Sequence, residues 1–136
     1  MAITNTPTEQ IVRIVSAQRA FFRSGQTLDI EYRLSALRAL KAALKKWEKT
    51  LAEALWKDLH KSYEEAYLTE LSIVLGEIDN HISHLKGWAS PKRCSTPLKM
   101  FPSRSKTISE PLGCSLIIAP WNYPVQLLLN PLVGAI

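Results

Sequence analysis

The stretch CSLIIAPWNYPVQLLL, residues 114–129, decides the fold class. Residues 114–118 form an apolar run bounded by glycine and proline, which is typical of a strand buried on both faces of a parallel sheet. A second apolar run follows Asn122 directly and predicts a helix, so that one strand leads into one helix. This arrangement is half of a β–α–β unit. We therefore predict an α/β fold.

The second apolar run ends at Ile136 without a helix cap or a polar face. A helix of this kind is incomplete by itself, because its apolar surface has no partner and its last carbonyl groups lack donors. We therefore expect residues 1–136 to be a piece of a larger α/β domain, with most of the function in the remaining part.

The first third of the chain predicts two helices. Thr6 precedes a proline and is followed three residues later by Glu9, a capping-box pattern that opens the first helix. Gly25 ends this helix. Thr27 or Asp29 opens the second helix, whose apolar residues also recur at helical spacing.

Two more segments upstream of residue 90 have a helical pattern. Residues 51–59 either continue the second helix or form a separate helix after a bend near Glu48. Ser62 and Glu65 form a second capping box, which predicts a long amphipathic helix through Trp88.

The pattern changes at Pro91, because four prolines from Pro91 to Pro111 interrupt any helical period. Residues 98–101 and 104–109 are expected to be extended, and Pro102-Ser103 lies where a hairpin would turn. This region therefore predicts a β-hairpin between the helices and the final strand.

The charge pattern argues against a nucleic-acid partner. The chain has 17 Lys and Arg against 12 Asp and Glu, a net charge of +5. Basic and acidic residues are interspersed along the predicted helices, as they are around Glu48, which indicates solvated helix faces. No nucleic-acid recognition motif accompanies the charge.

Three features bear on the compartment. Residues 1–5 lack the basic start and apolar stretch of a signal peptide. A membrane-spanning helix needs about 20 apolar residues, and the apolar run 125–136 is shorter than this. We therefore expect no membrane segment within this chain. Cys94 and Cys114 give no disulfide framework and suit a reducing environment. We therefore expect a cytoplasmic protein.

Several motifs together resemble the aldehyde dehydrogenase superfamily. The matching stretches are EPLG (110–113), PWNYP (120–124) and PLVGAI (131–136). The earlier stretches RAFFRSG (19–25) and DLHK (58–61) resemble the class 3-like branch, which includes fatty-aldehyde enzymes. The resemblance runs from about Ala17 to the last residue and covers the first quarter to third of a family member.

This resemblance implies NAD(P)-dependent oxidation of aldehydes to carboxylates, with NAD or NADP as the cofactor. In the family a cysteine thiolate attacks the aldehyde to form a thiohemiacetal, hydride leaves to the nicotinamide, and a glutamate activates the water that releases the acid. Neither that cysteine nor that glutamate is matched here, so both would lie beyond this chain. We expect residues 1–136 alone to be inactive.

The resemblance also implies a division of the chain. Residues 1–97 would be the helical part of an N-terminal cofactor-binding domain. Residues 98–110 would be a bridging β-hairpin, and residues 111–136 the first strand and helix of a truncated Rossmann-like core. Because such a hairpin pairs two subunits in relatives, we expect the parent enzyme to be a homodimer.

Four residues are the candidate site. Asn122 matches the asparagine of the family that donates to the oxyanion, and a neutral amide is well suited to stabilise developing negative charge. By the same resemblance Ile118 and Trp121 would contact the cofactor, and Tyr123 the aldehyde substrate. The alternatives are that Asn122 is only a turn residue or a helix cap, and that the three others are core residues.

Two other groups of residues are rejected as sites. Cys114 is expected in a buried strand, where an apolar setting raises the thiol pKa, and Cys94 has no base nearby in the sequence. His81 and His84 share a helix face, but no third ligand with sensible spacing appears, so we expect no metal site.

A different class of function is the alternative. The net charge and the amphipathic helices also fit a freestanding basic helical module that binds an acidic partner or a membrane surface. That alternative leaves the buried-type strand and the apolar tail unexplained.

Overall fold

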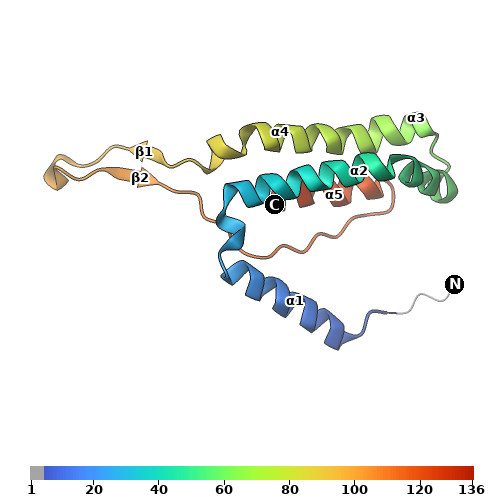
Figure 1. Cartoon of the computed structure of the whole chain (residues 1–136), viewed down its shortest axis with the longest axis horizontal. Coiled ribbons are helices and arrows are strands. Elements are labelled where there is room, and N and C mark those ends of the chain that lie inside the picture. The colour runs from blue at the N-terminus through green and yellow to red at the C-terminus, as the bar shows by residue number, and fades with distance from the viewer. Residues whose placement is uncertain (1–4) are drawn as a thin grey trace.

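The computed structural model describes residues 5–136 and consists mostly of helices (Figure 1). The expectation that the chain lacks a leader concerns mainly residues 1–4, which lie outside the described residues. The elements in chain order are α1 (Thr8–Arg23), η1 (Gln26–Leu28), α2 (Ile30–Leu59), α3 (Tyr63–Ala66), η2 (Tyr67–Leu71), α4 (Ser72–Ala89), β1 (Lys92–Cys94), η3 (Leu98–Met100), β2 (Ser105–Thr107) and α5 (Pro124–Ala135).

The core lies where α2, α4 and α5 pack together (Figure 1). Their apolar stripes face one another, and each fully buried aliphatic side chain contributes about 1.5–3 kcal/mol to folding. Helix α1 has no buried residue and lies apart from this body. The buried residues of the core are Leu34, Leu37, Leu44, Leu71, Val74, Ile78, Leu85 and Val133.

Helix α1 begins one residue later than a Thr6 cap predicts. Pro7 is the N-cap with an extended backbone (φ −56°, ψ 138°), and no side chain caps the helix. The Thr6–Glu9 capping box is therefore not formed, because its proline stands outside the helix instead of at the first helical position. The predicted end is confirmed: Gly25 has φ 77°, a left-handed conformation that glycine adopts without strain.

Helix α2 begins at the predicted Asp29 cap, whose carboxylate accepts a hydrogen bond from the Glu31 N–H at 3.1 Å. It continues without interruption to Leu59, so residues 51–59 belong to the second helix and there is no break near Glu48. His60 ends it with φ 54°. A single helix of 30 residues thus supports one side of the core.

Ser62 is confirmed as the N-cap, since its hydroxyl accepts from the Glu65 N–H at 3.1 Å, which is one half of the predicted capping box. The helix that follows contains one π-helical turn, η2, between α3 and α4. Ala66 and Leu71 stand five residues apart and are both fully buried. Five residues would turn an α-helix about 140° beyond one full turn, so the wider π turn is what lets both side chains face the core.

Loss of the Ser62 cap has a predictable effect. Ser62→Ala is expected to lower the free energy of unfolding by about 0.5–2 kcal/mol, because the Glu65 N–H loses its acceptor. Urea unfolding followed by circular dichroism measures this. Ser83→Ala is the matched control, since the Ser83 hydroxyl bonds within the helix to the Asp79 carbonyl and caps nothing. Equal losses in the two variants would contradict the capping role.

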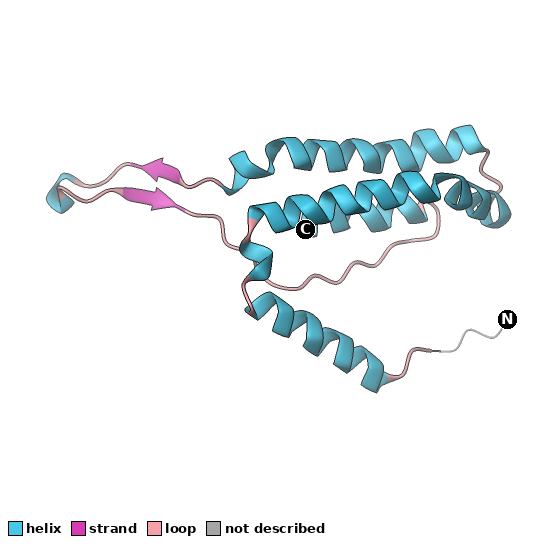
Figure 2. Ribbon diagram, viewed as in Figure 1, coloured by secondary structure: helices cyan, strands magenta, loops and turns pink. Residues whose placement is uncertain are grey.

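A two-stranded antiparallel sheet projects from the helical body (Figure 2). Strand β1 pairs with β2 in the register Lys92 to Thr107 and Cys94 to Ser105. The predicted hairpin is therefore present, but its first strand is not at 98–101. That stretch forms the 3₁₀ turn η3, because Pro97 and Pro102 flank it and cannot donate to a strand ladder.

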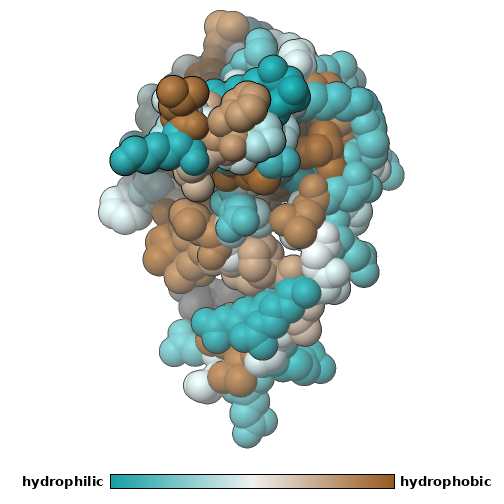
Figure 3. Space-filling model, turned by 90° about the vertical axis from the view of Figure 1, so that its left-hand side faces the viewer, coloured by the Kyte–Doolittle hydropathy of each residue, from teal (hydrophilic) through white to brown (hydrophobic). Residues whose placement is uncertain are grey.

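The tip of this hairpin is both apolar and basic. Leu98 and Phe101 are 89% and 82% exposed. Figure 3, which faces this end of the molecule, shows hydrophobic and hydrophilic side chains exposed together.

Among the described residues, no helix has the length and apolar character needed to cross a membrane.

The predicted strand at 114–118 is not formed. Residues 108–123 run as an extended loop from the hairpin to α5 (Figure 2). Leu116 and Ile118 are 85% and 83% exposed, so the expectation of burial is also wrong within this chain. The physical reason is that a strand is stabilised by hydrogen bonds to neighbouring strands, and in the described part of the chain none lies beside this segment.

Candidate functional site

The turn at residues 121–123, which we call the Asn122 turn, joins the extended loop to α5 (Figure 1). Tyr123 is the N-cap of α5 and Pro124 its first residue, where a missing N–H costs nothing. The Asn122 side chain is exposed. The turn therefore presents an amide at the start of a helix that is itself packed into the core.

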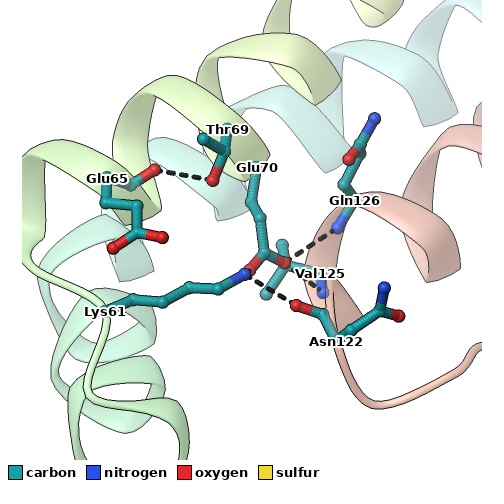
Figure 4. Close-up of polar contacts among 7 residues, drawn as sticks. All are labelled: Lys61, Glu65, Thr69, Glu70, Asn122, Val125 and Gln126. Carbon is teal, nitrogen blue, oxygen red and sulfur yellow. Dashed lines mark hydrogen bonds and ion pairs between the residues drawn. The ribbon is translucent and has the colours of Figure 1, made fainter.

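Two charged side chains from other elements hold this turn (Figure 4). Lys61 lies just after α2 and donates to the Asn122 backbone carbonyl at 2.8 Å. Glu70, from η2, forms an ion pair with Lys61 at 2.6 Å. The Lys61 ammonium also lies 3.8 Å from the centroid of the Tyr123 ring, a cation–π contact.

Glu70 caps α5 from a distance. One of its carboxylate oxygens accepts from the backbone N–H of Val125 at 2.8 Å and of Gln126 at 3.3 Å. These are among the first N–H groups of the helix, which have no partner within it. A carboxylate at this end also interacts favourably with the helix dipole. The alternative in which Asn122 caps the helix does not hold, because Tyr123 is the N-cap and Asn122 lies one residue earlier, in the turn.

The predicted site residues lie together along one short segment. Ile118 and Trp121 are 83% and 82% exposed, and Tyr123 is 36% exposed. Within this chain none of the three is a core residue. Their assignment to cofactor and substrate stays a prediction, as does the oxyanion role of Asn122.

The rejected residues have local partners. Cys94 and Cys114 are both exposed free thiols, so the expectation that Cys114 is buried is wrong for the same reason as the missing strand. His81 donates a hydrogen bond from Nδ1 to the Glu77 carbonyl, and His84 donates one from Nδ1 to the Asn80 carbonyl. Both imidazoles contact the Trp88 ring. Within residues 5–136 no three potential metal ligands cluster.

One titratable group near the α2–α3 corner has a shifted pKa. The Tyr63 hydroxyl donates to the Glu48 carboxylate, and this hydrogen bond raises the pKa of Tyr63 above its ordinary value. Tyr63 also lines an open cavity of about 570 Å³ together with Trp56. A second cavity, of about 340 Å³, lies between α1, residues 111–117 and the end of α5. Neither cavity is lined by the four predicted site residues.

Sequence reasoning missed Lys61 and Glu70 as residues of this site. A signal for Glu70 was present, because it stands four residues before Val74 and eight before Ile78 on the buried helix stripe. A carboxylate in an apolar stripe needs a buried partner. The sequence did not show that the partner is Lys61, that Lys61 contacts the Asn122 turn, or that Glu70 contacts the start of α5.

Comparison with known proteins places the chain in a family. The family model described as "Aldehyde dehydrogenase family" matches residues 1–136. The 4,4'-diaponeurosporen-aldehyde dehydrogenase of Staphylococcus aureus is 47% identical over 118 residues, which are 87% of this chain and 26% of the relative. The dimeric NADP-preferring aldehyde dehydrogenase of dog (Canis lupus familiaris) is 40% identical over 93% of this chain and 28% of the relative. Other relatives carry the name of family 3 members.

A solved structure shows the same fold. Staphylococcus aureus AldH in a substrate-bound state superposes with a TM-score of 0.88 at 42% sequence identity, over 97% of this chain and 28% of that one. The helices and hairpin described above thus form an incomplete α/β domain, and the chain spans about a quarter of the length of these relatives. By the match along its full length, the chain belongs to the aldehyde dehydrogenase family, and its relatives include the class 3 branch.

Proposed function

We propose that this chain is the N-terminal part of an NAD(P)-dependent aldehyde dehydrogenase that oxidises aldehydes to carboxylates. The observation that carries the proposal is the Asn122 turn, where an exposed amide stands at the start of a helix fixed by a buried ion pair. Family membership supports the same reaction class. It favours an enzyme over the alternative of a freestanding basic interaction module.

Asn122 would act on the aldehyde oxygen. When a nucleophile adds to an aldehyde, negative charge develops on that oxygen, and a donor held in place lowers the energy of the transition state. The amide needs no proton transfer to do this. Its exposed position leaves it free to reach a ligand that the rest of the protein brings to the turn.

NAD or NADP would bind beside the same turn and would accept a hydride from the substrate. Ile118 and Trp121 fit such a group, since both are exposed apolar side chains on the segment that leads into the turn. Tyr123 would face the aldehyde with the part of its ring that Lys61 does not cover. The nucleophilic cysteine and the general base would lie outside residues 1–136.

Two further proposals concern the parent protein. We propose a homodimer in which the projecting hairpin, whose tip and second strand lie within the predicted bridging residues 98–110, contacts the second subunit. The exposed apolar tip of the hairpin and the dimeric relative from dog support this. We also propose a cytoplasmic location, which the two exposed free cysteines support, since such thiols persist in reducing compartments.

The test uses the complete product of the gene that encodes this chain. We expect the purified protein to reduce NAD or NADP when an aldehyde is added, and to release the carboxylate, measured by the absorbance of the reduced cofactor and by chromatography. The 136-residue chain alone, as the control, should show no turnover. Absence of aldehyde-dependent cofactor reduction across short and long aldehydes, aliphatic and aromatic, would overturn the proposed function.

A further inference from the structure

The Lys61–Glu70 pair is buried far more deeply than the other ion pairs of the described chain. Its side chains are 8% and 0% exposed, whereas those of the Lys86–Glu31 pair are 68% and 61% exposed. Removing two charges from water is costly, and a buried pair is often no more stabilising than apolar residues of the same size. Stability alone therefore does not account for an ion pair at this position.

Both partners direct their remaining hydrogen bonds to the Asn122 turn and to the first turn of α5 that follows it (Figure 4). Lys61 donates to the carbonyl of Asn122, and Glu70 accepts from the N–H groups of Val125 and Gln126. The backbone is thus fixed at Asn122 itself and again three and four residues later. The side-chain amide of Asn122 extends away from the pair, so none of these contacts occupies it.

The two anchors come from separate parts of the helical body. Lys61 stands between α2 and α3, and Glu70 stands on the π turn η2, whose neighbouring residue Leu71 is fully buried in the core. Because η2 is packed in this way, the carboxylate has little freedom to move. The position of the turn is therefore set by the core and not by the extended loop that precedes it.

We propose that Lys61 and Glu70 are positioning residues that hold the Asn122 amide in place for the reaction. They act through the backbone of the turn and do not touch the substrate. This inference rests on the proposed function, because it assigns the pair a role only if the Asn122 amide stabilises the oxyanion. Displacing a group by about 1 Å from its productive position can cost up to about 10²-fold in rate.

The variants Glu70→Gln, Lys61→Met and the double variant Lys61→Met/Glu70→Gln test the inference in the complete gene product. We expect each to lower kcat by about 10- to 100-fold, with little change in the KM for the cofactor. Glu31→Gln/Lys86→Met is the matched control, since it removes the same kind of pair from an exposed surface. Its kcat should equal that of the unmodified protein.

A double-mutant cycle separates positioning from a general structural role. If the pair acts through Asn122, adding Glu70→Gln to Asn122→Ala should lower kcat little further, because the amide it positions is already gone. If the pair only maintains the fold, the two losses should multiply. Multiplying losses would overturn the inference.

The outcomes also distinguish this inference from the proposed function. If Asn122→Ala leaves kcat unchanged, the oxyanion role fails, and the inference fails with it. If Asn122→Ala lowers kcat while the Glu70 and Lys61 variants do not, only the inference fails. The double variant leaves no unpaired buried charge and so guards against unfolding of the single variants. If all three variants fail to fold, the pair holds the fold as a whole and the inference is overturned.

Discussion

Asn122→Ala in the complete gene product is expected to lower kcat by about 10²–10³-fold, the range for removal of one oxyanion donor. The affinity for the cofactor should change little, because the amide is directed at the aldehyde oxygen. The melting temperature should also change little, since Asn122 is exposed and the first N–H groups of α5 bond to Glu70. Steady-state kinetics and thermal unfolding of one variant measure all three quantities.

The control for this prediction is Asn80→Ala, which removes an exposed asparagine side chain from α4. It should leave kcat unchanged. If Asn122→Ala has normal kcat and a lowered melting temperature, Asn122 stabilises the turn and has no part in the reaction. This outcome would remove Asn122 from the catalytic residues.

The second large effect is on stability. Ile78→Ala should lower the free energy of unfolding of the 136-residue chain by about 2–5 kcal/mol, because truncation of this fully buried side chain leaves a cavity in the core. The core of α2, α4 and α5 is formed entirely within these residues, so the chain should unfold cooperatively in urea. The midpoint of that transition, followed by circular dichroism, measures the loss.

Two variants calibrate this result. Ile78→Val removes one methyl group at the same position and should cost about 0.5–1.5 kcal/mol. Ile73→Ala removes a side chain that is 40% exposed on the same helix and should cost less than Ile78→Ala. Similar losses for Ile73→Ala and Ile78→Ala, or a chain with no cooperative transition, would contradict the core as described.

The helices could be predicted from the sequence where their ends depend on local hydrogen bonds. Asp29 and Ser62 cap helices through N–H groups two and three residues away, and such contacts form whatever the rest of the chain does. The Thr6 cap failed on an equally local detail, the extended backbone of Pro7. The π turn at 67–71 was missed, because its buried residues depart from the α-helical period.

The parts that sequence reasoning placed wrongly depend on distant partners. The run 114–118 has the composition of a strand, but a strand needs neighbouring strands, and residues 5–136 place none beside it. The residues of the site could be predicted only in part, for the same reason. Asn122 was found from a contiguous motif, whereas Glu70 reaches Val125 across 55 positions of the sequence, a separation that no local pattern encodes.

The π turn has a consequence for insertions and deletions. It holds one residue more than an α-helical turn, so deleting Leu68, which is 66% exposed, would restore a continuous α-helix without removing any buried side chain. Ala66 and Leu71 would then stand four residues apart on an α-helix, about 40° past one full turn, so both side chains would still face the core. We therefore expect the Lys61–Glu70 ion pair to survive this deletion, because the helix on either side of the π turn keeps its relative orientation. In this five-residue stretch the identity of Glu70 therefore matters more than the number of residues, and homologous sequences should keep Glu70 while tolerating the loss of one exposed residue.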